Sequence, residues 1–299
     1  MVDIIAPEVR DHDNDGVFEA APEMFKLFWP DVRGSYFFRS RRAFLDFMRK
    51  CGGRIHYIPY GSRQTPPFAL AGNWRSRADI TALWHVKGEG AVKRKLVNTA
   101  ACRSFDAGSE AFVTRPLGEY EAEEYARWGF EPVYEIVLLE KRMRRESVAP
   151  TALTGVEIIR YRKKYLNDVL DLDATAFDDF WRLDERTMEA VASTCRQNAF
   201  LLALGGGEVL GYAVGGVNGR FGYMQRLGIH ALHQGKGVGG LLSSSLISAL
   251  KALGATSVMV NTQRENSSAL QLYRKLGFET LPDRRLIMRL TPTDTEQVI

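Results

Sequence analysis

One stretch, from Tyr223 to Leu253, limits what this chain can fold into more than any other. It begins with β-favouring side chains, passes through a short polar turn, and continues as a helix in which apolar residues recur at intervals of three and four. At the turn, where the first helical N–H groups have no partner, four residues lack a Cβ atom: Gly235, Gly237, Gly239 and Gly240. These N–H groups and the helix dipole together favour a bound phosphate or pyrophosphate.

Two well-known phosphate motifs do not fit this turn. A dinucleotide-binding turn needs an acidic residue about 20 residues further on, but the strand expected at 257–263 reads Ser-Val-Met-Val-Asn-Thr-Gln. A P-loop needs Ser or Thr after its Gly-Lys pair, whereas Lys236 is followed by Gly237. On the glycines alone, a tight helix start without any ligand stays open.

The segment after that strand helps to distinguish between these interpretations of the turn. Residues 264–279 predict a short helix with Asn266 or Ser267 as its N-cap and Gly277 after its last turn. Together, the two segments resemble the GCN5-related N-acetyltransferase (GNAT) superfamily. Its first signature, [Q/R]-x-x-G-x-[G/A], matches Gln234, Gly237 and Gly239, and its second matches Asn266, Ala269, Leu270, Leu272, Tyr273, Leu276, Gly277 and Phe278. The resemblance covers roughly residues 155–290.

A weaker copy of the same pattern lies in the first half of the chain. Tyr125-Ala-Arg-Trp-Gly-Phe-Glu lines up with Tyr273-Arg-Lys-Leu-Gly-Phe-Glu, and other pairs align at similar offsets. With the resemblance, this repeat implies an α/β fold of two tandem GNAT domains, 1–146 and 152–299. Each would have a central, mostly antiparallel sheet of six to seven strands flanked by about four helices. The charged run at 140–146 and Pro150 are interpreted as the linker.

Periodicity and turn residues give the expected elements of each copy. In the first, helices are predicted near 16–28, 40–51, 90–104 and 119–128, and strands near 2–6, 54–60, 67–74, 79–86, 111–115 and 133–140. In the second, helices are predicted near 164–176, 186–197, 237–253 and 267–276, and strands near 155–161, 199–205, 208–218, 221–230, 257–263 and 285–290.

Composition excludes several other classes of protein. Net charge is +4, with 40 basic against 36 acidic side chains and no basic stripe interleaved with aromatics, so nucleic acid is not an expected partner. No apolar run is long enough for a membrane span and no signal peptide is recognised. The three cysteines are widely spaced, which favours a reducing, cytoplasmic setting. We expect a monomer or a homodimer.

No metal is expected. Residues 11–16 copy the first half of an EF-hand loop, but the twelfth position holds Pro22 instead of Glu. These acidic residues are better explained as a helix cap.

The resemblance implies that acetyl-CoA is the co-substrate and that the strands at 221–230 and 257–263 splay apart to admit it. Its pantetheine arm would pair with the main chain of Leu227 and Ile229, and Asn266 would bond its amides. The pyrophosphate would rest on the turn formed by Gln234, Gly235, Lys236, Gly237, Val238 and Gly239.

Tyr273 is the expected general acid, because a phenol within hydrogen-bond reach can protonate the leaving thiolate. A packed aromatic residue is the alternative. The general base is open: histone-acetylating relatives place a Glu where this chain has Tyr223, so Tyr223, His230, Glu265, or Asp178 or Asp179 through water remain candidates. Positioning of the amine beside the thioester could itself suffice.

The expected acceptor loop is the link between the first two helices of the second copy, where Asp178, Asp179 and Trp181 are the candidate substrate-binding residues. Carboxylates and aromatic rings suit a cationic amine. A solvated acidic loop with inward-packed rings is the alternative.

The first copy lacks key parts of the motif. Val92 replaces the last glycine, Glu89 places a negative charge where phosphates would sit, and the Asn of the second signature is missing, although Tyr125 is retained. We therefore predict an N-acetyltransferase that acts on a primary amine of a small molecule and whose first copy is degenerate. The alternatives are a peptide N-terminal or lysine acetyltransferase, a non-catalytic acyl-CoA sensor, and a nucleic-acid-binding or scaffold protein that keeps only the fold.

Overall fold

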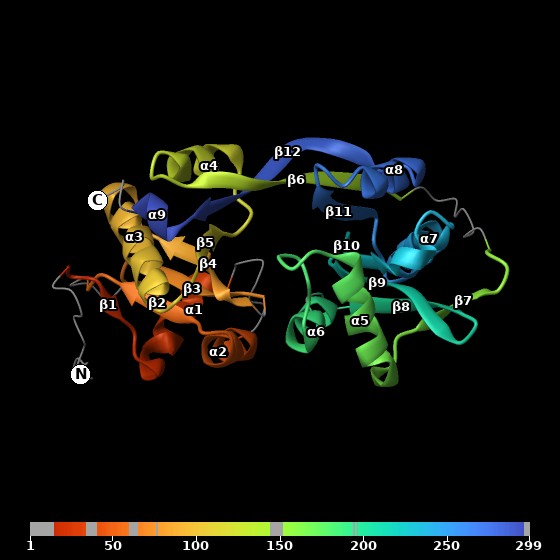
Figure 1. Ribbon diagram of the computed structural model, residues 1–299, viewed down its shortest axis with the longest axis horizontal. Coiled ribbons are helices and arrows are strands. Elements are labelled where there is room, and N and C mark those ends of the chain that lie inside the picture. The colour runs from red at the N-terminus through yellow and green to blue at the C-terminus, as the bar shows by residue number, and fades with distance from the viewer. Residues whose placement is uncertain are drawn as a thin grey trace. The chain divides into compact units, whose positions relative to one another are not determined.

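The computed structural model describes residues 15–33, 41–59, 65–75, 77–143, 152–193, 195 and 197–295 (Figure 1). The chain forms two compact units, Met1–Val133 with Leu286–Ile299 and Tyr134–Arg285. The strand predicted near 2–6 and the first part of the EF-hand-like segment, residues 11–14, lie outside the described residues.

The first unit is built on one sheet with the strand order β1-β2-β3-β4-β5-β12. Its elements before the exchanged strand are β1 (Phe18–Glu19), a 3-10 turn (Pro22–Met24), α1 (Phe25–Val32), α2 (Arg41–Lys50), β2 (Arg54–Tyr57), β3 (Phe68–Trp74), β4 (Arg77–Lys87), α3 (Gly90–Asp106), β5 (Ala111–Thr114) and α4 (Glu119–Ala126).

The second unit has the strand order β6-β11-β10-β9-β8-β7. Its elements are β6 (Glu131–Arg142), β7 (Val156–Arg160), a 3-10 turn (Lys163–Tyr165), α5 (Leu166–Ala176), α6 (Glu185–Ser193), β8 (Gln197–Gly205), β9 (Glu208–Asn218), β10 (Phe221–Ile229), a 3-10 turn (Ala231–His233), α7 (Val238–Ala252), β11 (Ser257–Gln263) and α8 (Ser267–Lys275). The chain ends with β12 (Glu279–Leu290) and α9 (Pro292–Thr295).

Both units follow the same order of helices and strands, which confirms the predicted fold of two tandem α/β units with mostly antiparallel sheets. In the second unit, the Gly206–Gly207 turn joins β8 to β9 as expected, since both glycines have positive φ, 60° and 88°. Apolar residues of α7 pack on one face of this sheet, and those of α5 and α6 pack on the other.

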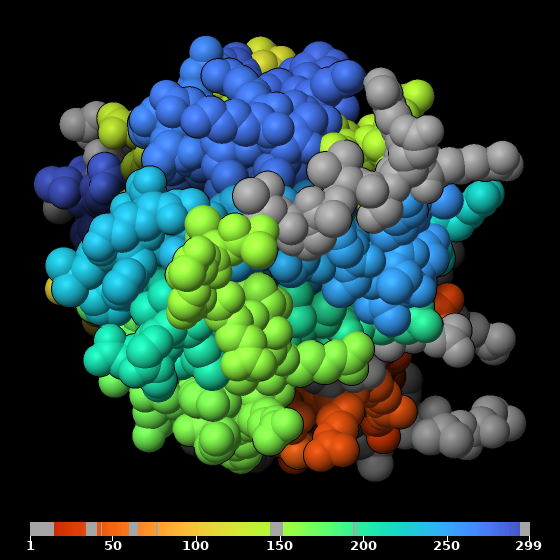
Figure 2. All heavy atoms as spheres, turned by 90° about the vertical axis from the view of Figure 1, so that its right-hand side faces the viewer, coloured from red at the N-terminus to blue at the C-terminus, as the bar shows by residue number. Residues whose placement is uncertain are grey.

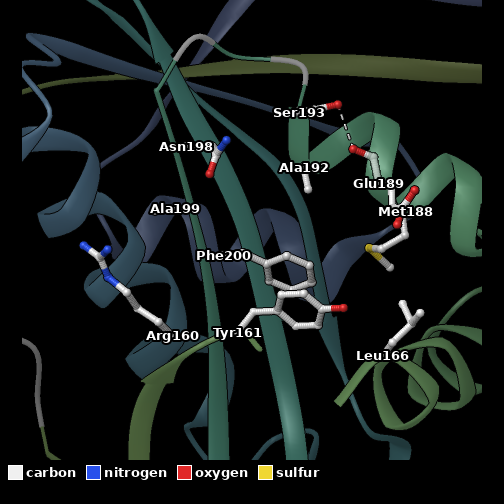
Figure 3. Close-up of a pocket in the computed structure, with 10 residues that line it drawn as sticks. All are labelled: Arg160, Tyr161, Leu166, Met188, Glu189, Ala192, Ser193, Asn198, Ala199 and Phe200. Atoms are coloured by element: carbon white, nitrogen blue, oxygen red, sulfur yellow. Dashed lines mark hydrogen bonds between the residues drawn. The ribbon is translucent and has the colours of Figure 1, made fainter. Parts of the chain in front are cut away.

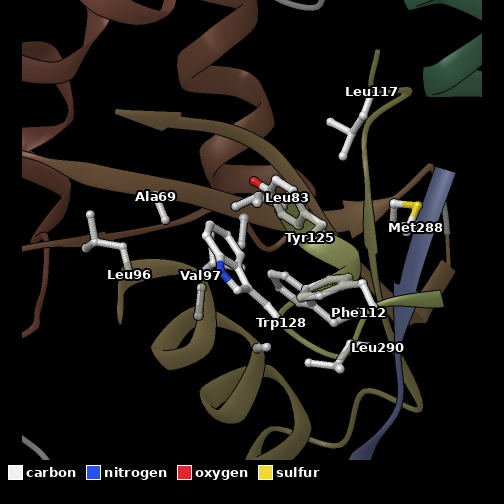
Figure 4. Packing of buried hydrophobic residues seen from close by; sticks show 14 of the residues in the cluster. Ala69, Leu83, Leu96, Val97, Phe112, Leu117, Tyr125, Trp128, Met288 and Leu290 are labelled. Carbon is white, nitrogen blue, oxygen red and sulfur yellow. The ribbon is translucent and has the colours of Figure 1, made fainter. Parts of the chain in front are cut away.

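The two units exchange their last strands. Residues 136–142 of β6 pair antiparallel with β11 in the second unit. The end of β12 pairs with β5 in the first unit, where Arg289 and Leu290 lie opposite Val113 and Phe112. Met288 and Leu290 enter the core of the first unit beside Phe112 and Tyr125 (Figure 4). The boundaries of the two compact units in the chain therefore differ from the boundary between the two copies of the repeat, which lies between residues 146 and 152.

Some predicted elements were wrong in extent. The helix expected at 16–28 begins only at Phe25, because residues 18–19 pair with β2 and Pro22–Met24 form a 3-10 turn. The last strand starts at Glu279 rather than near 285, since it runs from the second unit into the first. Strand β6 likewise continues through Arg142, into the charged run that we interpreted as linker.

Two buried leucines, Leu290 and Leu139, test the exchange. Each lies in a strand that packs in one unit but comes from the other copy of the repeat. Leu290→Ala should lower the free energy of unfolding of the first unit by about 2–5 kcal/mol, since the change leaves a cavity; Leu290 is 1% exposed. Leu139→Ala should weaken the second unit instead, because Leu139 packs in its core.

Hydrogen exchange followed by mass spectrometry separates the two effects. Leu290→Ala should speed amide exchange in α3 and β5 and leave β8 and β9 unchanged, with the reverse for Leu139→Ala. Loss of protection in the same unit for both variants would contradict the exchange.

Candidate active site

Strands β10 and β11 begin as neighbours and then part. Their parallel pairing runs from Phe221 opposite Ser257 to Met224 opposite Val260 and stops there. A bulge follows in β10, between Met224 and Arg226, where its register with β9 shifts. Beyond this point β11 continues to pair with β6 on its other side. The main chain of residues 225–229 is thus not paired with β11, as a splayed pair of strands requires.

Helix α7 starts beside this split without a side-chain cap. Its N-cap is Gly237 with φ of 89°, and the first helical bond runs from the Leu241 N–H to the Gly237 carbonyl oxygen, 3.1 Å. No acidic side chain lies in its first turn. Gly235 also has positive φ, 72°, with open space where a Cβ would be. The junction therefore presents unpaired N–H groups and the positive end of a helix dipole.

The other predicted cofactor-binding residues surround the same junction. The Gln234 side chain donates to the Ile229 carbonyl oxygen, 3.2 Å, and so ties the turn to the end of β10. Leu227 and Ile229 are partly buried against the α7 core, whereas Lys236 is exposed. Leu153 lies against Gly237, so the segment before β7 borders the turn (Figure 2, light green against cyan).

Helix α8 is capped by the predicted residue. The Asn266 side-chain oxygen accepts from the Ala269 N–H, 3.1 Å, and from the Ser268 hydroxyl, 3.0 Å. This capping role fixes the helix start and leaves the Asn266 NH₂ group as the part of the side chain that can donate elsewhere.

Tyr273 lies on the inner face of α8. It is 5% exposed, and its ring packs 5.7 Å from that of Phe278. Burial raises the pKa of its hydroxyl to about 12, so the phenol keeps its proton at neutral pH. A protonated phenol in this position has the form that a general acid requires.

Tyr223 occupies a different part of the sheet. It lies in the paired section of β10, between Gly216 of β9 and Met259 of β11, one residue before the last pair. Of the other base candidates, His230 accepts from the Leu232 N–H through Nδ1, 3.3 Å, and Glu265 is exposed. Strand β10 itself carries no carboxylate.

The carboxylates of the predicted acceptor loop bond to groups within the same loop. Asp178 accepts from the Trp181 N–H, 3.2 Å, and Asp179 pairs with Arg182 at 2.6 Å. The Trp181 ring lies 5.1 Å from the ring of Tyr134, which belongs to the exchanged strand β6. Tyr134 was missed from the sequence, because only the strand exchange brings it into this unit.

A buried ion pair holds this loop to β10. The Arg226 guanidinium donates to both Asp173 carboxylate oxygens through Nη2, at 2.8 and 2.6 Å. The Tyr212 hydroxyl donates to the same carboxylate, and the Leu183 N–H donates to it at 2.8 Å. Arg226 also donates to the Trp181 carbonyl oxygen, 2.9 Å. Bonds from Arg226, Tyr212 and Leu183 thus converge on Asp173, and Arg226 also bonds the loop.

Sequence reasoning missed this cluster as well. Asp173 shares an apolar helix face with Val169 and Leu172, and Arg226 occupies a buried position in the alternation of β10. A single charge on each of two otherwise apolar faces was the signal, since such charges are rarely buried unless they are paired.

The corresponding cleft of the first unit is filled. Parallel pairing of β4 and β5 ends at Leu83 opposite Thr114. The Lys93 ammonium lies 5.2 Å from the centre of the Tyr125 ring and pairs with Glu124 at 2.5 Å. Arg115 donates to both Glu121 oxygens at 3.0 and 2.9 Å. The hollow beside Tyr125, which Arg115 and Glu121 also line, is too narrow to admit a water molecule.

The model of the acetyltransferase (GNAT) family matches residues 166–278. A curated relative, an acetyltransferase of Pectobacterium atrosepticum, is 33% identical over 82 residues, which are 27% of this chain and 58% of that protein. The chain thus spans little more than half the length of this relative.

Solved structures resemble the whole chain. A tandem GNAT protein from the clavulanic acid biosynthesis pathway has a TM-score of 0.67 at 12% identity, covering 92% of this chain and 98% of its own. A GCN5-related N-acetyltransferase from Sphaerobacter thermophilus has a TM-score of 0.59 at 15% identity, covering 93% and 96%. At these identities the likeness shows the shared fold.

The buried ion pair predicts an asymmetric response to substitution. Arg226→Met leaves the Asp173 carboxylate buried without its cation and should cost about 3–5 kcal/mol of unfolding free energy. The double variant with Asp173→Asn should lose less than the two single losses added together, because the unpaired charge is gone. Urea unfolding measures all three variants.

Arg182→Met is the matched control, since Arg182 pairs with Asp179 in the same loop but is exposed. It should cost less than about 1 kcal/mol. Equal losses of unfolding free energy for Arg226→Met and Arg182→Met would show that the buried pair contributes no more to stability than the exposed pair.

Proposed function

We propose that this chain transfers an acetyl group from acetyl-CoA to a primary amine of a small molecule, because it is a tandem-domain member of the GCN5-related N-acetyltransferase superfamily. One observation carries the proposal: β10 and β11 separate after Met224 and Val260, beside the uncapped start of α7. This arrangement offers free main-chain groups to an extended arm and helix N–H groups to a pyrophosphate.

In this proposal the co-substrate follows the split. Main-chain groups of Leu227 and Ile229 pair with the pantetheine arm, and the Asn266 NH₂ group donates to one of its amide carbonyls. The pyrophosphate rests on the α7 junction, where the exposed Lys236 adds a positive charge. The residues assigned to it are Gln234, Gly235, Lys236, Gly237, Val238 and Gly239.

Tyr273 then acts as general acid in a direct transfer. The amine nitrogen attacks the thioester carbonyl, a C–N bond forms and the C–S bond breaks. The Tyr273 hydroxyl gives its proton to the departing sulfur and regains one from solvent, which also takes the proton that the amine loses. We place Tyr223 on the acceptor side of β10 as the candidate that relays this second proton through water.

The acceptor is proposed to bind at the loop after α5. Asp178, Asp179 and Trp181 lie there, and Tyr134 adds a second ring to the wall. Because Asp178 and Asp179 already bond groups of the loop, an ammonium would share these carboxylates, and the aromatic wall would contribute cation–π attraction.

The first unit is proposed to bind no acetyl-CoA. Lys93 pairs with Glu124 over the Tyr125 ring, and the hollow beside Tyr125 is too narrow to admit a water molecule. Strand β6, from the first copy of the repeat, lies mostly in the second unit and brings Tyr134 there.

The proposal is tested first by calorimetric titration of acetyl-CoA. Wild-type protein should bind one equivalent, and Gly237→Trp should abolish binding, because the indole blocks the α7 junction. Gly90→Trp is the matched control: Gly90 is the repeat counterpart, also with positive φ, and its variant should bind normally. No binding by the wild type, or a second site that Gly90→Trp removes, would overturn the assignment.

Turnover is tested with Tyr273→Phe, by following thiol release with a panel of small primary amines and N-terminal peptides. Its kcat should fall about 100-fold, within the usual range for a general acid, while affinity for acetyl-CoA stays unchanged. Tyr125→Phe, the repeat counterpart in the first unit, should keep full activity. Unchanged turnover in Tyr273→Phe would assign the residue to packing alone, and turnover only with peptides would exclude a small-molecule acceptor.

The pH profile adds a check with a defined sign. Tyr273 is in its donating form below its pKa of about 12. The kcat of the wild type should therefore not fall between about pH 8 and about pH 10, where an ordinary tyrosine would begin to lose its proton. A fall in kcat with an apparent pKa near 10 would contradict Tyr273 as the acid.

A further inference from the structure

A second hollow lies in the Tyr134–Arg285 unit, away from the split strands (Figure 3). Its volume is about 410 Å³, within the size range of small-molecule sites. Its walls come from the ends of β7 and β8, the start of α5 and one face of α6. None of its lining residues belongs to β10, β11, α7 or α8.

One strand separates the strands that border this hollow and the proposed transfer site. Strand β9 lies between β8 and β10, so β8 and β10 are about 10 Å apart at the usual strand spacing. Buried Cys195 also lies directly over Gly216, between the hollow's Asn198 and Tyr223 of β10.

The floor is a stacked aromatic pair. The rings of Tyr161 and Phe200 are 4.1 Å apart with an angle of 10° between their planes. Their main chains are joined as well, since the Tyr161 N–H donates to the Phe200 carbonyl oxygen at 2.8 Å. This second contact fixes the pair, and Tyr161 remains only partly buried, with the hollow beside it.

The wall beside this floor is negative. Glu189 lines the hollow, and Glu185 lies one helical turn earlier on α6. Burial is the main cause that raises the pKa of the Tyr161 hydroxyl, and the Glu189 and Glu185 carboxylates raise it further. Within the described part of the chain, neither carboxylate has a basic side chain at ion-pair distance. Arg160 also lines the hollow, on the opposite side of the aromatic pair from Glu189 in Figure 3.

We propose that this hollow is a second binding site, specific for a small organic ammonium ion, which would lie on the Tyr161 ring and face the Glu189 carboxylate. An aromatic face attracts a cation through its quadrupole. The Glu189 carboxylate adds a Coulomb attraction of the same sign. An uncharged ligand of the same shape gains only the apolar contact, so charge discrimination is the property that defines this site.

The test uses choline and its uncharged isostere 3,3-dimethylbutan-1-ol, titrated against the full chain by ligand-observed NMR. Choline should bind the wild type about fivefold more tightly than the alcohol, as cation–π and carboxylate attraction at a solvent-open site predict. Glu189→Gln should remove this preference, and Tyr161→Leu should weaken choline binding about as much.

Glu157→Gln serves as the matched control, because Glu157 is an exposed carboxylate of β7 that does not line the hollow. It should keep the preference for choline. Equal affinity of wild-type protein for the two ligands, or equal loss in Glu157→Gln and Glu189→Gln, would overturn the proposal. Acetyl-CoA titration of each variant shows whether the transfer site is intact, so failure of one site is distinguished from failure of the other.

Discussion

The buried pair between Arg226 and Asp173 fixes the loop after α5 in the second unit. Two charges taken out of water are tolerated only where each finds several partners, and here Tyr212, Leu183 and the Trp181 carbonyl supply them. The same pair joins α5, β10 and the loop after α5. A loop with exposed carboxylates is thereby given a defined position beside the bulge, where β10 turns away from β11.

The features that the sequence predicted well depend on residues close together in the chain. The glycines at 235–240 and the Asn266 cap are read from neighbouring residues, and the strand, turn and helices around them lie within a residue or two of the expected bounds. What it missed depends on contacts between distant segments. Tyr134 reaches Trp181, and Arg226 reaches Asp173, only through tertiary folding. The start of β12 at Glu279 was likewise missed, because the strand runs from the second unit into the first, where its end pairs with β5.

The two units share one topology but differ in the side chains beside their split strands. In each, a parallel pair of strands parts beside the start of a helix. In the first unit Lys93 lies over Tyr125 and pairs with Glu124, so side chains occupy the space that the strands open. Tyr273 of the second unit and Tyr125 of the first each have a phenylalanine neighbour, Phe278 and Phe130. The helix start of the second unit has Gly240 where the first has Lys93.

The exchanged strands also set the order in which the protein can mature on the ribosome. Domains are usually completed from the N-terminus during synthesis. Here the second unit has all its strands once residue 285 has emerged, since β6 is already present. The first unit must wait for Leu286–Leu290, although its other strands were made first. Until Leu286–Leu290 have emerged, its β5 edge is open, and such an edge pairs readily with other chains. This short segment of β12, made well after β5, therefore protects an edge of the first unit from aggregation.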